Sequence, residues 1–213
     1  MPVNASREQI LGRIRTALTK PAPPPPGGPP RAIFDPVTDL LDRFQKECAI
    51  TLTECVVTDG QDASREAIAN ILASLPPGDF FIQDVPELHN LVDGRTGDRP
   101  IRWSSEGAPP KTTQVSLTLA EALVALTGSI VTSSSCGGRG ASAVPDCHIV
   151  YARLDQLVPD LESALALIKQ RGIADRNSYV GLITGSSRTA DIEKILVLGA
   201  HGPRRLAVVL QTK

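Results

Sequence analysis

Strand-like and helix-like segments alternate along the chain from residue 35 to the C-terminus, and this alternation restricts the fold more than any other feature. β-rich segments occupy residues 50–58, 79–83, 129–133, 148–151, 179–184 and 206–210. Helical patterns occupy residues 36–48, 63–75, 118–125, 159–170 and 190–198. Strands separated by helices build βαβ units and parallel sheets. We therefore predict an α/β fold with a Rossmann-like, mostly parallel sheet and helices on both of its faces.

The N-terminal segment differs from the rest of the chain. Residues 7–19 place their apolar side chains on one helical face, and Ser6 is a suitable N-cap. The run of prolines and glycines at 21–30 ends this helix and favours an extended linker. We predict a helix and linker over 1–34 and a single α/β domain over 35–213. The helix docks either on its own domain or on a partner, and the sequence leaves both open.

Composition excludes several classes of function. The 213 residues carry a formal net charge of -1 and only 3% aromatic residues, which argues against binding nucleic acid. No segment approaches the about 20 apolar residues that span a bilayer, and the N-terminus lacks the apolar core of a signal peptide. We expect a cytoplasmic protein with four reduced cysteines. Residues 84–114, rich in glycine, proline and charge, are expected to include exposed loop that acts as a flap over a site.

The most informative polar segment follows the strand predicted at 179–184. The turn is small and rich in hydroxyl groups, and a helix is predicted after it, with Thr189 as its N-cap. Ligands bind at the carboxyl ends of strands in open parallel sheets. Backbone N–H groups, hydroxyls and a guanidinium suit a carboxylate or phosphate, and the candidate residues are Gly185, Ser186, Ser187, Arg188 and Thr189. A well-capped turn without a ligand is the alternative interpretation.

A second polar segment surrounds the strand predicted at 129–133. Glycines after a strand let the backbone approach a ligand closely, although the pattern matches no nucleotide-binding motif. The candidate ligand-binding residues are Thr127, Gly128, Ser129, Gly137, Gly138 and Arg139. A mobile loop is the alternative. Cys136 is a possible nucleophile, but a buried or loop thiol is the favoured interpretation.

One histidine is a candidate for proton transfer. His201 stands in a Gly-Pro turn before the last strand, and imidazole titrates near neutral pH. A solvated loop histidine is the more common case, and His148, beside Cys147, is expected to be structural. The four cysteines lack the spacing of a metal knuckle or an iron–sulfur cluster. We predict no metal and no cofactor bound by this chain.

Together these segments resemble the lactate-utilisation protein C family of LUD-domain proteins. The resemblance rests on 127–129, 137–139, 148–150, 158–161 and above all on the run 185–193 joined to 196–203. It implies a fold similar to the ribose-5-phosphate isomerase and CoA-transferase superfamily. It also implies an accessory subunit without its own cluster in a system that oxidises L-lactate, with two iron–sulfur proteins as partners. In one departure, Leu126 stands where many relatives carry an acid before the Thr-Gly pair.

The resemblance and the residue types lead to one set of expected roles. A small carboxylate or phosphorylated ligand pairs with Arg188, helped by Arg139, while the hydroxyl groups orient it and His201 moves a proton. Two alternatives remain. The chain is an enzyme acting alone on a phosphorylated, CoA or carboxylate substrate, which Leu126 disfavours, or it is an interaction protein that docks through residues 7–19.

Overall fold

The computed structural model describes residues 3–19, 34–189, 197–199 and 202–213. The chain divides into two compact units, Met1–Asp35 and Pro36–Lys213. The described part of the first unit contains one helix, α1 (Val3–Leu18). This helix begins earlier than predicted, so Ser6 lies inside it and is not its N-cap. The proline-rich run at 21–30 lies outside the described residues.

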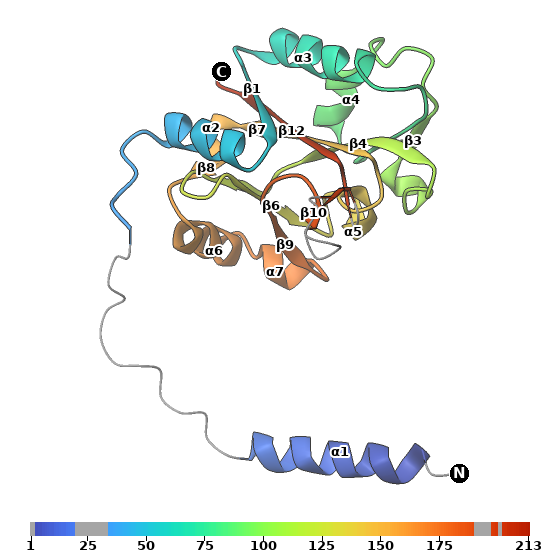
Figure 1. Cartoon of the computed structure of the whole chain (residues 1–213), viewed down its shortest axis with the longest axis vertical. Coiled ribbons are helices and arrows are strands. Elements are labelled where there is room, and N and C mark those ends of the chain that lie inside the picture. The colour runs from blue at the N-terminus through green and yellow to red at the C-terminus, as the bar shows by residue number, and fades with distance from the viewer. Residues whose placement is uncertain (1–2, 20–33, 190–196, 200–201) are drawn as a thin grey trace. The chain divides into compact units, whose positions relative to one another are not determined.

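A six-stranded sheet forms the centre of the second unit, and all neighbouring strands in it are parallel (Figure 1). Its strands, in spatial order, are β1 (Thr53–Thr58), β12 (Arg205–Gln211), β7 (Cys147–Arg153), β4 (Thr113–Leu119), β2 (Asp79–Ile82) and β3 (Ile101–Trp103). The α/β class and the mostly parallel sheet are therefore confirmed. The central strands are almost entirely buried, which is why they read as apolar runs in the sequence.

Successive side chains of these strands point to opposite faces of the sheet, and each face has its own core. On one face, Val115 and Leu117 pack with helices α3 (Gln61–Ala73) and α4 (Pro86–Val92). On the other, Val150 and Val208 pack with α2 (Leu40–Ile50) and with a second sheet. α2 begins later than predicted because the Asp39 carboxylate caps it.

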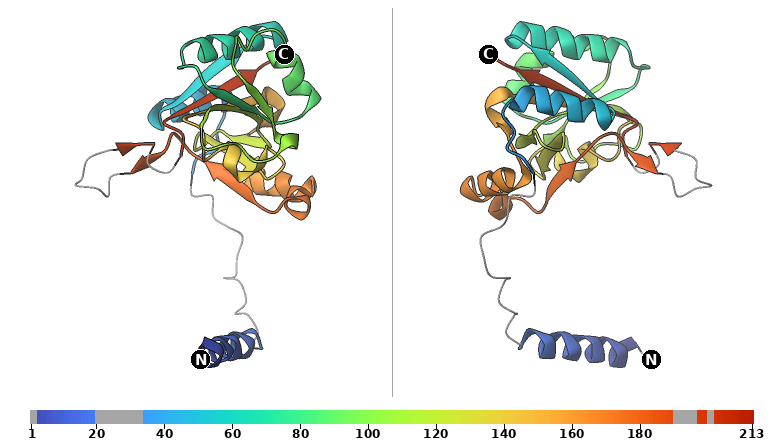
Figure 2. Two further views of the ribbon diagram at one scale, coloured as in Figure 1. Left: turned by 90° about the vertical axis from the view of Figure 1, so that its right-hand side faces the viewer. Right: turned by 60° about the vertical axis from the view of Figure 1, so that its left-hand side comes forward.

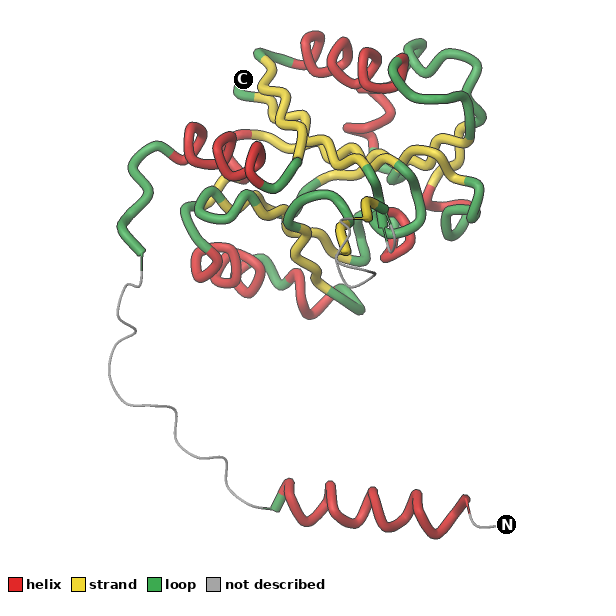
Figure 3. Tube along the Cα trace, viewed as in Figure 1, coloured by secondary structure: helices red, strands yellow, loops and turns green. Residues whose placement is uncertain are grey.

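The second sheet has four strands and is mixed. Its spatial order is β8 (Leu157–Val158), β5 (Ala122–Val124), β6 (Ser129–Ser133) and β9 (Val180–Ile183), and β6 is antiparallel to both β5 and β9. Helices α6 (Leu161–Gln170) and α7 (Ile173–Arg176) cover its outer face through Ala164, Ile168 and Ile173. Figure 3 shows the strands as inner layers with helices outside them.

Three further predictions from the sequence are wrong. The helix predicted over 118–125 is instead the end of β4 followed by β5, because these residues are buried between layers and paired with neighbouring strands. The helix predicted over 190–198 is contradicted at its end, where β11 (Val197–Leu198) pairs antiparallel with β10 (Arg188–Thr189); residues 190–196 lie outside the described residues. Thr189 is therefore in a strand and is not an N-cap. The strand pair projects from the body of the unit (Figure 2).

The segment 84–114 is more regular than predicted. It contains α4, β3, the short 3₁₀ helix η1 (Ser104–Glu106) and the start of β4, with loop over 93–100 and 107–112. β2, β3 and β4 pair side by side, and this brings the segment after β3 to the carboxyl edge of the parallel sheet.

Candidate functional site

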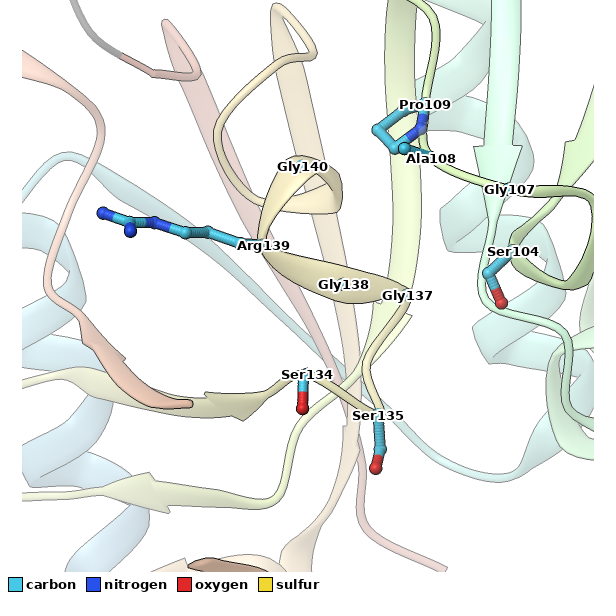
Figure 4. Close-up of a pocket in the computed structure, with 10 residues that line it drawn as sticks. All are labelled: Ser104, Gly107, Ala108, Pro109, Ser134, Ser135, Gly137, Gly138, Arg139 and Gly140. Carbon is cyan, nitrogen blue, oxygen red and sulfur yellow. The ribbon is translucent and has the colours of Figure 1, made fainter. Parts of the chain in front are cut away.

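A cavity of about 320 Å³ opens where the winding of the parallel sheet reverses (Figure 4). From β2 the chain winds outward to the edge strand β3, and from β4 it winds the other way, to β7 and β12. Such a switch point, at the carboxyl ends of the strands, is where open α/β sheets bind ligands. The lining residues come from the segment after β3 and from the loop after β6, and they are Ser104, Gly107, Ala108, Pro109, Ser134, Ser135, Gly137, Gly138, Arg139 and Gly140.

The buried Gln83 side chain ties the loop after β6 to this edge of the sheet. Its Nε2 donates to the Ser135 carbonyl oxygen at 2.8 Å, and its Oε1 accepts from the Leu119 backbone N–H at 2.8 Å. Gln83 directly follows β2 and Leu119 ends β4, so one amide joins two strand ends and the loop. Sequence reasoning missed this residue, since no local pattern distinguishes it from an ordinary loop glutamine.

The glycines of this loop have two different roles. A Cβ at Gly137 would lie 3.1 Å from Cε1 of Phe81, and one at Gly140 would lie 2.9 Å from Cγ of Pro109, so these two positions allow close packing. Gly138 has φ +79°, and a Cβ there would meet no described atom within 4 Å. The left-handed backbone conformation accounts for glycine at this position, and its role as a ligand-binding residue stays a prediction.

The lining is polar and has no negative charge among the described residues. Arg139 is the only charged residue of the ten, and the serines supply three hydroxyl groups. Figure 4 shows the Arg139 side chain directed away from the wall that carries Ser104 and Pro109. Arg139 is exposed.

The other predicted ligand residues gather elsewhere, around a chain of hydroxyl groups. The Thr127 and Ser129 hydroxyls lie 2.7 Å apart, and those of Ser129 and Thr184 lie 2.6 Å apart. The structure thus brings Thr127 and Ser129 next to the turn after β9, but none of these residues lines the described cavity.

Two predicted ligand glycines in this second group pack against α2 instead. A Cβ at Gly128 would lie 2.9 Å from Cβ of Glu47, and one at Gly185 would lie 2.3 Å from the Thr51 carbonyl oxygen. Both glycines have positive φ, +63° and +81°. Close approach to the C-terminal turn of α2 therefore accounts for both of them without a ligand.

The turn 185–189 does not lie where the sequence argument expected it. β9, which leads into the turn, belongs to the small mixed sheet. The turn packs against Thr51, two residues before β1 begins, so it lies at the amino end of that strand and not at the carboxyl edge of the parallel sheet. Ser186 is buried, and the Ser187 backbone is held by Pro203 and Gly199, at 2.9 and 2.8 Å. Arg188 is exposed. His201 lies outside the described residues.

Two further titratable groups are buried in neutral form. Burial raises the pKa of the Cys136 thiol to about 11, so at neutral pH it is no thiolate nucleophile. Burial lowers the pKa of His148 to about 4. The His148 Nε2 lies 2.9 Å from the Thr118 hydroxyl, and its Nδ1 is buried without a hydrogen-bond partner among the described residues.

The part of the chain that the structure describes contains no group of three His, Cys, Asp or Glu side chains arranged to hold a metal ion. Within the same residues, every helix is too short or too polar to span a bilayer.

Comparison with known proteins identifies the class of protein to which this fold belongs. Residues 111–211, which hold β4 to β12 and the cavity loop after β6, match the family model of the LUD domain. A crystal structure of a DUF162 family protein from Deinococcus radiodurans superposes with a TM-score of 0.62 over 81% of this chain and 96% of that one. At 20% identity, it shows the fold alone.

Similar proteins of known name identify one family within the LUD-domain proteins. Lactate utilization protein C of Bacillus subtilis is 31% identical over 196 residues, covering 81% of this chain and 78% of the relative. Lactate utilization protein C of Bacillus velezensis is 34% identical over 189 residues, with 81% and 78% covered. The chain belongs to this family of LUD-domain proteins named lactate utilization protein C.

Proposed function

We propose that this chain acts in lactate utilisation and binds a small carboxylate in the cavity at the switch point. The name of its relatives, lactate utilization protein C, supports the role in lactate utilisation. The cavity carries the ligand proposal, because its ten described lining residues offer three hydroxyl groups and one guanidinium but no carboxylate. A volume of about 320 Å³ lies at the small end of the range for ligand pockets and leaves ample room for a small carboxylate.

Arg139 is the proposed charge partner of the ligand, in place of Arg188. Arg139 stands on the cavity loop, whereas Arg188 is not among the residues that line it. A guanidinium pairs with a carboxylate through two parallel hydrogen bonds, which gives both energy and orientation. Hydroxyl groups of Ser104, Ser134 and Ser135 complete the set of donors.

We further propose that the chain is an accessory subunit without its own cluster in an iron–sulfur system that oxidises L-lactate. The family resemblance supports this role and implies two iron–sulfur partner proteins. In this arrangement the partners carry the electrons, and this chain recognises the carboxylate.

The ligand is tested by titrating the full chain with L-lactate and pyruvate and recording tryptophan fluorescence. Trp103 is the single tryptophan of the chain and directly precedes the cavity residue Ser104. We expect saturable binding that Arg139→Gln weakens about tenfold or more, the size of a lost charged hydrogen bond. Arg188→Gln is the matched control and should bind like wild type. Equal effects of the two substitutions, or no binding by wild type, would remove the proposed ligand site.

The partners are tested by purifying the tagged chain from its native cells. Co-purifying proteins that contain iron, with lactate-dependent dye reduction in the eluate, support the accessory role. Turnover of lactate by the pure chain would favour an enzyme acting alone. Loss of the partners on deletion of residues 1–30, with the second unit still folded, would favour docking through α1.

A further inference from the structure

Three hydrogen-bond donors converge on one oxygen atom behind the cavity. The side-chain oxygen Oδ1 of Asn177 accepts from the Ser134 hydroxyl at 2.9 Å, the Ser135 backbone N–H at 2.7 Å and the Ser135 hydroxyl at 2.6 Å. Asn177 directly follows α7, and both serines line the cavity.

The orientation of this amide is fixed at its other end. The Asn177 Nδ2 donates to the Ile173 carbonyl oxygen at 2.8 Å. Turning the amide over would point its NH₂ group at the three donors and its oxygen at a carbonyl, so the hydrogen-bond network assigns the oxygen to the serine side. Asn177 is therefore held as an acceptor facing the cavity loop.

An amide oxygen has two lone pairs, so one of the three donors is in excess. The Ser134 hydroxyl oxygen also accepts from the Ser178 backbone N–H at 3.0 Å, which anchors it. The Ser135 N–H has a second acceptor, the Ser133 hydroxyl oxygen at 3.2 Å. The exposed Ser135 hydroxyl has Asn177 as its only partner among the described residues. Of the three donors, it therefore requires the least free energy to leave the Asn177 oxygen.

A second donor lies on the opposite wall. The Ser104 hydroxyl oxygen accepts from the Asp84 backbone N–H at 2.9 Å, and this leaves its own proton free of any described acceptor. Figure 4 shows Ser104 on one side of the cavity and Ser134 and Ser135 on the other. A rotation about one side-chain bond turns the Ser135 hydroxyl from Asn177 to a ligand.

We propose that Asn177 is a positioning residue that holds the Ser135 hydroxyl in the unliganded cavity and releases it to an oxygen of a bound oxyanion. This inference rests on the proposed function, which supplies the carboxylate. The ligand then bridges the cavity, with one oxygen on Ser135 and the next on Ser104, while Arg139 balances its charge. Inorganic phosphate presents the same oxyanion chemistry, so the experiment includes it as a separate probe.

The experiment measures affinity for L-lactate, pyruvate, inorganic phosphate and the uncharged lactamide by Trp103 fluorescence in the full chain. Ser135→Ala should weaken binding of the anions about tenfold, the size of one charge-assisted hydrogen bond. Ser135→Thr restores a hydroxyl and should restore affinity, which a merely structural role of this serine does not predict. Ser178→Ala is the matched control, because it removes an exposed neighbouring hydroxyl but keeps the backbone N–H that Ser134 needs.

Asn177→Asp provides a second perturbation, which strengthens the hold on the serine donors instead of removing one of them. A carboxylate holds the serine donors more strongly and repels an anion, so we expect anion binding to fall by at least as much as in Ser135→Ala, with lactamide affected less. Wild-type binding that Ser135→Ala and Asn177→Asp leave unchanged overturns this inference alone. Absence of anion binding by wild type overturns the proposed ligand site and the inference with it. Binding of phosphate but neither carboxylate keeps the Ser135 mechanism and corrects the ligand class.

Discussion

A methyl group added at Gly185 tests whether the turn after β9 serves to pack against α2. Gly185 has φ +81°, a left-handed conformation that costs alanine about 1 kcal/mol. The new Cβ would also lie 2.3 Å from the Thr51 carbonyl oxygen, a backbone atom that cannot rotate away. Forcing such a contact apart costs about 1 to 3 kcal/mol. Gly185→Ala should therefore lower the free energy of unfolding by about 2 to 4 kcal/mol.

Gly94→Ala is the matched control for this prediction. Gly94 has φ +66°, but a Cβ there would meet no described atom within 4 Å, so only the conformational cost of about 1 kcal/mol applies. Urea unfolding followed by circular dichroism gives both free energies, with equal m-values as the condition for comparing them. Equal losses in the two variants would show that α2 does not press on the turn, and would return Gly185 to the candidate ligand residues.

Two other predictions concern buried polar groups. Gln83→Leu leaves the Leu119 N–H and the Ser135 carbonyl without partners, so urea unfolding should show a loss of about 2 to 4 kcal/mol together with weaker lactate binding. Gln156→Leu also breaks two amide hydrogen bonds, but neither involves a residue that lines the cavity, so this change should lower stability without changing affinity. Because folding depresses the pKa of His148 to about 4, the unfolded chain binds its proton first, and stability should fall as pH drops from about 6.5 to 4, by about 3 kcal/mol in total. The free energy of unfolding should fall less steeply with decreasing pH in His148→Gln than in wild type. Equal pH dependence in the two proteins would contradict a buried neutral imidazole.

The strands of the parallel sheet were predictable because burial on both faces leaves continuous apolar runs. Residues 206–210 and 148–151 lie within β12 and β7, as predicted. The same reasoning failed at 118–125, where leucine, alanine and glutamate favour a helix in isolation. Those residues form strands because partners distant in the sequence pair with them, and a local pattern does not contain that information.

The site was predictable in part for the same reason. The loop 137–139 was recognised because consecutive glycines with an arginine are a local signal, and the structure places it on the cavity. Gln83 and Asn177 were missed, since their partners on that loop lie 52 and 42 positions away in the sequence. A single amide in a loop gains meaning only when the fold brings it to a particular set of donors and acceptors.

The two glycine- and serine-rich segments show why residue type alone does not locate a ligand. At Gly128 and Gly185 the missing side chain would point into α2, so helix packing explains the glycine. At Gly138 a Cβ would meet no described atom within 4 Å, and the φ of +79° alone accounts for the glycine. The sheet to which the preceding strand belongs does not show which turn reaches the cavity, because β6 and β9 both belong to the small mixed sheet. The difference is that the loop after β6 crosses to the carboxyl ends of β2, β3 and β4, where the parallel sheet changes its direction of winding.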